Sequence, residues 1–251
     1  MSKNQYRNIA SIYDSLNSEY DYNALAQFLA KEIQSNEKVK SSLVLDLGCG
    51  TGKVTFLLRE LGYDMTGVDI SEEMLSVAKN ICAKKDISDI LWLCQDMRSF
   101  ELYGTVDACV CTLDSLNYLV GAGDLKRCFS LVHNYLIPDG VFVFDINTRS
   151  KLEGIDGQSL VREDEDVFCV WQCALEEDSL CHYYFDIFEL NEDDTWERYS
   201  EHHVERIYEP EALTAMLQEA GFTEIEQRGE LSDNPPAEDE ARIFFVARKP
   251  V

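Results

Sequence analysis

A glycine-rich turn after a short apolar run is the feature that most constrains what this chain can fold into. The run Leu43–Leu47 is typical of a strand that is buried on both faces of a parallel sheet. The turn carries glycine at alternate positions, Gly48, Gly50 and Gly52. Glycine permits left-handed backbone angles and lets a ligand approach the main chain, and the helix expected over Lys53–Leu61 points its N-terminus at the same place. We therefore predict a strand–turn–helix unit that binds a ligand.

The segments around this unit alternate between strand and helix. Further strands are expected at 65–68, 90–94, 106–112 and 141–145, and helices at 72–84 and 124–136. Apolar side chains at helical spacing between Ala24 and Ile33 predict another helix before the first strand. Pro138–Gly140 is expected to form a turn. Alternation of this kind predicts an α/β fold with a mostly parallel, doubly wound sheet.

Residues 151–209 break the alternation. Three runs, 167–175, 180–190 and 195–207, are predicted to be antiparallel strands that form an inserted β element. A helix over 210–220 and strands at 223–228 and 242–247 then complete the sheet. We divide the chain into an N-terminal helical segment (1–41), a ligand-binding core (42–150), an inserted antiparallel element (151–209) and a C-terminal helix and hairpin (210–251).

The residues around the turn favour one kind of ligand. Asp69 comes 21 residues after Gly48, at the end of the second strand, where a carboxylate can accept hydrogen bonds from both ribose hydroxyls of an adenosine. The dinucleotide fingerprint needs its third glycine one residue later than Gly52. Asp46 would repel a pyrophosphate but attract an amino group. The spacing therefore favours an adenosine ligand with a cationic amino-acid tail over a nicotinamide dinucleotide.

Three motifs carry a resemblance to a known family. Asp46–Lys53, Val68–Ser71 and Gln95–Met97 follow one another at consecutive strand ends. Together they resemble the motifs of class I S-adenosylmethionine-dependent methyltransferases of the small-molecule type. The resemblance implies a Rossmann-like seven-stranded sheet and S-adenosyl-L-methionine as cofactor. It also implies that residues 1–41 form a lid, that 42–150 bind the cofactor and that 151–209 form a cap over the acceptor site.

The resemblance also implies roles for individual residues. The glycines would line the methionine part of the cofactor, Asp46 would face its ammonium, Asp69 would hold the ribose and Asp96 the adenine amine. The full set of cofactor-binding residues is Tyr13, Asp46, Gly48, Cys49, Gly50, Gly52, Asp69, Ile70, Met74, Asp96, Met97 and Leu113.

The acceptor site is expected after the fourth strand. Asp114, Asn117 and Tyr118 lie there, and Tyr22 belongs to an N-terminal tyrosine-rich segment, starting at Tyr6, that resembles the lid of amino-sugar N-methyltransferases. These four are the candidates for substrate binding, although a loop also needs polar residues and the tyrosines could serve packing alone.

His202 and His203 are the candidates for acid–base catalysis, because imidazole titrates near neutrality. They are adjacent on a predicted strand, so they point to opposite faces and do not suggest a metal site. Packing is the alternative role for each. No metal is expected.

The charge balance argues against several partners. Asp and Glu number 47 against 22 Lys and Arg, for a net charge of −25, so nucleic acid and anionic membranes are not expected to bind. Residues 151–209 alone hold 18 acidic and four basic residues. They form either a solvated face or a field that attracts a cationic amine.

The sequence also suggests a compartment. The start of the chain has no apolar run typical of a secretory signal, and no apolar run is long enough to span a bilayer. The nine cysteines are expected to be buried free thiols in a cytoplasmic protein.

We expect methyl transfer to N or O of a small-molecule acceptor by proximity and in-line orientation, in a monomer or homodimer. A nicotinamide-dependent oxidoreductase and a non-catalytic adenosine-binding module remain the alternatives.

Overall fold

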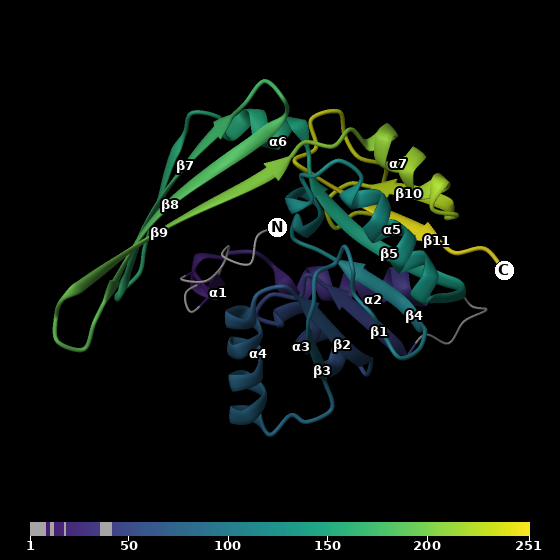
Figure 1. Ribbon diagram of the computed structural model, residues 1–251, viewed down its shortest axis with the longest axis horizontal. Helices are drawn as coiled ribbons and strands as arrows, with labels where there is room; N and C mark the ends of the chain where they lie inside the picture. Colours follow the sequence, from purple (N-terminus) through teal and green to yellow (C-terminus); the bar gives the residue numbers. More distant parts are fainter. Residues whose placement is uncertain (1–8, 11–12, 18, 36–41) are drawn as a thin grey trace.

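Two β-sheets form the framework of the molecule. A computed structural model describes residues 9–10, 13–17, 19–35 and 42–251. One sheet has seven strands in the order β10-β11-β5-β4-β1-β2-β3, and the other has four in the order β6-β7-β8-β9. The second sheet extends from the first as an arm (Figure 1). The predicted fold class is confirmed.

The seven-stranded sheet is mostly parallel. Its strands are β1 (Leu43–Leu47), β2 (Asp64–Asp69), β3 (Leu91–Cys94), β4 (Val106–Cys111), β5 (Leu136–Asn147), β10 (Thr223–Arg228) and β11 (Arg242–Arg248). Strand β1 pairs in parallel with both β2 and β4, and β11 runs antiparallel between β5 and β10. The direction of winding therefore reverses between β1 and β4, where ligands bind in open α/β sheets.

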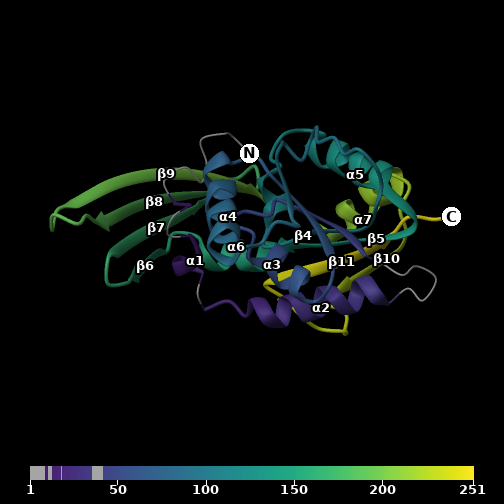
Figure 2. The same ribbon diagram turned by 90° about the horizontal axis from the view of Figure 1, so that it is seen from below.

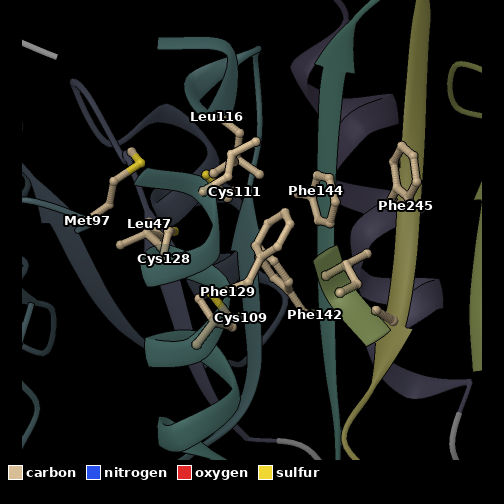
Figure 3. Packing of buried hydrophobic residues seen from close by; sticks show 14 of the residues in the cluster. Leu47, Met97, Cys109, Cys111, Leu116, Cys128, Phe129, Phe142, Phe144 and Phe245 are labelled. Atoms are coloured by element: carbon tan, nitrogen blue, oxygen red, sulfur yellow. The ribbon is translucent and has the colours of Figure 1, made fainter. Parts of the chain in front are cut away.

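Helices cover both faces of this sheet. They are α2 (Tyr22–Gln34), α3 (Lys53–Glu60), α4 (Glu72–Lys85), α5 (Asp124–Tyr135) and α7 (Pro210–Glu219). Helices α2 and α5 lie on opposite sides (Figure 2). A hydrophobic core lies on each face of the sheet, and the side chains of β5 alternate between the two. Phe142 and Phe144 pack with Phe129 of α5, while Val143 packs on the α2 side. The ring of Phe144 also stacks on that of Phe245 in β11, with centroids 4.9 Å apart (Figure 3).

The arm consists of β6 (Ser159–Glu163), β7 (Val167–Leu175), β8 (Leu180–Leu190) and β9 (Trp196–Arg206). The last three agree with the expected strands. Helix α6 (Arg149–Ile155) and strand β6 were not expected, because α6 is short and contains Gly154 and β6 exposes most of its side chains. The short elements α1 (Tyr13–Leu16) and η1 (Ser115–Tyr118) complete the description.

Two further expectations are wrong. Pro138–Gly140 lies inside β5 rather than in a separate turn, because the ladder with β4 shifts register and accommodates the extra residues. Cys94 is exposed, unlike the other eight cysteines, because β3 is an edge strand of the sheet. Among the described residues, no helix is long and apolar enough to cross a membrane.

Candidate active site

The glycine turn joins β1 to α3 in left-handed geometry. Gly48, Gly50 and Gly52 have φ angles of 78°, 55° and 83°. A side chain on Gly48 would place its Cβ 2.8 Å from the Ser115 hydroxyl oxygen, and one on Gly52 would lie 2.5 Å from the Trp92 ring. Gly52 therefore makes room for Trp92, and it does not line the pockets beside the turn.

A narrow cleft lies between the turn and the ends of β2 and β3. Its lining residues are Gly48, Val68, Asp69, Ile70, Gln95, Asp96 and Met97. Asp69 Oδ2 accepts from the Gly50 amide and Oδ1 accepts from the Ser71 amide, both at 2.8 Å. Burial raises the pKa of Asp69, and these two bonds oppose that rise. The sequence predicted five residues of this cleft.

Two of the predicted adenine neighbours have other contacts. The Asp96 carboxylate forms an ion pair with Arg98 at 2.5 Å while it lines the cleft. Met74 lies outside the cleft lining and is buried with Ile9, Ala10 and residues of the arm.

A second pocket continues from the other side of Gly48. Asp46 lines it with only 2% of its surface exposed, and it accepts a hydrogen bond from the Thr55 hydroxyl at 2.5 Å. Burial raises the pKa of Asp46 to about 7, with Thr55 opposing the shift. Tyr22, predicted to bind the acceptor, lines this pocket instead, together with Cys49 and Gly50.

A larger cavity of about 340 Å³ lies beneath the arm. Tyr13 and Leu113 line both this cavity and the second pocket, so the two spaces adjoin. Its wall is rich in rings and charges, among them Tyr118, Trp171, Tyr183, Phe185, His203, Asp114, Lys151, Glu205 and Arg242. The cleft, the pocket and the cavity thus follow one another across the carboxyl ends of the parallel strands.

The loop after β4 is held in a sparsely populated conformation. Leu113 and Asp114 have φ angles of 57° and 56°. Both amides donate to the buried carboxylate of Asp145, at 2.7 and 2.8 Å. Arg242 pairs with Asp145 and, at 2.7 Å, with Asp114. This network fixes the boundary between pocket and cavity, and strained backbone held in this way is common at functional sites.

Tyr118, His203 and Glu201 form a buried chain on the cavity wall. His203 Nδ1 lies 3.2 Å from the Tyr118 hydroxyl, and Nε2 lies 2.8 Å from Glu201 Oε2. The other oxygen of Glu201 accepts from the Ile9 amide at 3.0 Å. Since an ionised Glu201 accepts from Nε2–H, Nδ1 can accept from the tyrosine hydroxyl.

Comparison with known proteins assigns the family. A family described as a methyltransferase domain matches residues 44–140. YqeM of Bacillus subtilis, which carries the name of a methyltransferase, is 32% identical over 97% of this chain and 97% of its own. An S-adenosylmethionine-dependent methyltransferase from Clostridium acetobutylicum is similar in structure, with a TM-score of 0.87, 30% identity and coverage of 99% of this chain and 100% of that one.

This chain is a class I S-adenosylmethionine-dependent methyltransferase. A more distant relative from Streptomyces fradiae is named as a dTDP-3-amino-3,6-dideoxy-α-D-glucopyranose N,N-dimethyltransferase. It is 29% identical over 55% of this chain and 52% of its own.

Besides Tyr22, two of the residues predicted for the acceptor side do not line the cavity beneath the arm. Asn117 is fully buried, and its amide group is bonded to the backbone of Asn147 and Arg206, so it joins η1 to β5 and β9. His202 lies on the outer face of the arm, where its ring stacks on Tyr184 with centroids 4.7 Å apart. Tyr6 lies outside the described residues. Of the two histidines, only His203 lines the cavity.

The sequence did not single out several charged groups of the methyltransferase. Arg242 pairs with Asp114 in the loop after β4, 128 residues away along the chain, and no local sequence pattern predicts that contact. Glu201 and Glu205 share a strand face with His203, which the two-residue period of β9 could have shown. In the part of the chain that the structure describes, no cluster of three or more His, Cys, Asp or Glu could hold a metal ion.

Proposed function

We propose that this methyltransferase transfers a methyl group to the nitrogen of a small-molecule amine held in the cavity beneath the arm. The observation that carries the proposal is that this cavity adjoins the glycine-turn pocket at Tyr13 and Leu113. A cavity of about 340 Å³ suits a small molecule. The name of the Streptomyces fradiae relative specifies an amine of a nucleotide-linked sugar, which is consistent with nitrogen as the methylated atom.

The residues of the cleft and pocket fit the cofactor. S-adenosylmethionine supplies an already activated methyl group, so the chain needs mainly to bind, orient and exclude water. Asp69, aligned by two backbone amides, would hold the ribose hydroxyls. Asp46, buried with a single hydroxyl donor, would face the ammonium group.

His203 is the proposed acid–base group on the acceptor side. Its Nδ1 faces the Tyr118 hydroxyl at 3.2 Å, and Glu201 holds its other nitrogen. A proton leaving an acceptor beside Tyr118 could pass to His203 through that hydroxyl. Tyr118 and Asp114 would contact the acceptor itself, since both line the cavity.

Turnover on a matched panel tests the proposal. The intact enzyme is supplied with S-adenosylmethionine and small amines, each paired with the alcohol or phenol of the same carbon skeleton, and formation of S-adenosylhomocysteine is measured. Amines are expected to be methylated and their oxygen counterparts not. Methylation of the oxygen compounds alone, or of no small molecule by an enzyme that binds the cofactor, contradicts the proposal.

A further inference from the structure

Glu205 is a buried carboxylate that the protein leaves half satisfied. It lies on β9, lines the acceptor cavity and is only 3% exposed. Its Oε2 accepts from the Asn147 side-chain amide at 2.9 Å. Within the described residues, Oε1 has no hydrogen-bond donor, and no cationic side chain lies within ion-pair distance of either oxygen. A buried carboxylate is normally paired, and Glu205 lines the cavity, so its second oxygen is placed to accept a hydrogen bond from a molecule bound there.

The cationic side chains near Glu205 form hydrogen bonds or ion pairs with other residues. Lys151 Nζ donates to Asn147 Oδ1 at 2.7 Å, and Arg242 pairs with Asp114 and Asp145. Arg162, also on the cavity wall, pairs with Glu19 at 2.7 Å. The protein therefore supplies no direct counter-ion for Glu205.

The surrounding wall suits a cation. The rings of Trp171, Phe185 and Tyr183 stand in a row, with successive centroids 6.1 and 6.3 Å apart, and all three line the cavity. Ring faces attract cations, most strongly where water is excluded. Burial, with Asp114 second, raises the pKa of Glu205 to about 8, a shift that a cation beside it would reverse.

We infer that Glu205 binds the ammonium group of the acceptor, so that the enzyme selects cationic alkylamines over alcohols and carboxylic acids of the same shape. The inference rests on the proposed role of the cavity and adds the group that gives it chemical selectivity. The other carboxylate that lines the cavity, Asp114, is already paired with Arg242. Glu205 is therefore the carboxylate available to pair with a cationic ligand.

Three probes with the same ring test this selectivity. Cyclohexylamine, cyclohexanol and cyclohexanecarboxylate are titrated by ligand-observed NMR into the protein loaded with S-adenosylhomocysteine. The amine is expected to bind about tenfold or more tightly than the alcohol, and the carboxylate not measurably, because a charge-assisted hydrogen bond is gained only by the amine.

A matched pair of variants locates the effect. Glu205→Gln keeps the size of the side chain and an oxygen that accepts from Asn147, so it is expected to bind the amine and the alcohol equally. Glu197→Gln removes the same charge from an exposed position of β9 and is expected to keep the preference. Unchanged affinity for S-adenosylhomocysteine shows that each variant is folded.

The outcomes separate this inference from the proposed function. The inference is overturned if the unaltered protein binds the amine no more tightly than the alcohol, and this comparison needs no variant. It is also overturned if Glu205→Gln still prefers the amine. If amines are turned over with equal KM by the unaltered enzyme and Glu205→Gln, the proposed function stands and the role of Glu205 is refuted. If the probes bind as expected but no amine is methylated, the proposed function fails instead.

Discussion

Asp46 and Asp69 are both buried beside the glycine turn, but their carboxylates are satisfied differently. Asp69 accepts from two backbone amides, which hold it in one orientation. Asp46 accepts from one hydroxyl and has a pKa raised by burial to about 7. Asp69 is therefore suited to a neutral polyol such as a ribose, and Asp46 to a cation that would restore its ionised form.

Asp69→Ala is expected to weaken binding of S-adenosylhomocysteine at least about tenfold, because the carboxylate that accepts hydrogen bonds from the ribose hydroxyls is lost. Isothermal titration calorimetry measures the change. Asp64→Ala, at the exposed start of the same strand, serves as the control and should bind normally. Equal affinity in the two variants would show that Asp69 does not hold the ligand.

Binding of S-adenosylhomocysteine near pH 7 is expected to release a fraction of a proton. Because burial raises the pKa of Asp46 to about 7, this carboxyl group is expected to be partly protonated without ligand, and a cationic ammonium beside it would lower that pKa. Titration calorimetry in two buffers of different ionisation enthalpy gives the number of protons released. Asp46→Asn should reduce that number, and an unchanged value would place the ammonium away from Asp46.

The unliganded protein is expected to lose stability between about pH 5 and pH 9. Asp46 and Glu205 bind a proton more tightly in the folded chain, with pKa values of about 7 and 8, so the stability that they contribute is complete below their ordinary range and is lost as the pH rises through these values. Thermal denaturation across this range measures the slope. Glu205→Gln should flatten it and raise the midpoint at pH 9, by about 2–4 °C for each kcal/mol regained. A slope that the variant leaves unchanged would contradict this account.

At the scale of elements, Arg242 of β11 ties the sheet to the loop after β4. Its guanidinium compensates Asp145 and Asp114, and Asp145 in turn holds the amides of the two left-handed residues. The loop between the pocket and the cavity therefore depends on a strand near the other end of the chain.

Arg242→Ala is expected to lower the free energy of unfolding by about 3–5 kcal/mol, because it leaves a buried carboxylate without its partner. Urea denaturation measures the loss. Arg198→Ala breaks an exposed pair with Asp186 and should cost less than about 1 kcal/mol. Similar losses in both variants would mean that the Arg242 network is not stabilising.

At the scale of the whole molecule, the acidity of the arm lies mainly away from the cavity. Half of the 18 acidic residues in 151–209 occupy three turns, at 164–166, 176–178 and 192–194. The turn between β8 and β9 lies at the far end of the arm (Figure 1). From the same segment, the charged residues that line the cavity are Lys151, Arg162 and Glu205. This distribution favours a solvated surface over a field that steers an amine.

Neutralising the turn at Glu192, Asp193 and Asp194 with the corresponding amides is expected to leave the KM for an amine, and its dependence on salt, within about twofold of the unaltered enzyme. At physiological salt the Debye length is about 8 Å, so exposed charges at the tip are screened from the cavity. Steady-state rates between low and high salt test this. If the KM of the neutralised variant at low salt is severalfold higher than that of the unaltered enzyme, the steering hypothesis is supported instead.

The sequence by itself determined which residues meet at the glycine turn of this methyltransferase. The glycine turn, Asp69 and Gln95–Met97 are short motifs at consecutive strand ends, and parallel strands bring their carboxyl ends to one edge. Their mutual placement follows from topology, so local sequence was enough. The same holds for the three long strands of the arm, whose period of two is visible in the chain.

Only the tertiary structure decided which side chains line the cavity beneath the arm. The alternation in β9 separates His202 from His203 but does not show which face of the strand is buried. Contacts with η1 and β5 placed His203 and Glu205 on the buried face. Asn117 was predicted to bind the acceptor, but its side-chain amide donates to backbone carbonyls of β5 and β9. Contacts such as Arg242 with Asp114 join positions 128 residues apart, and their energy depends on burial that only the assembled sheets provide.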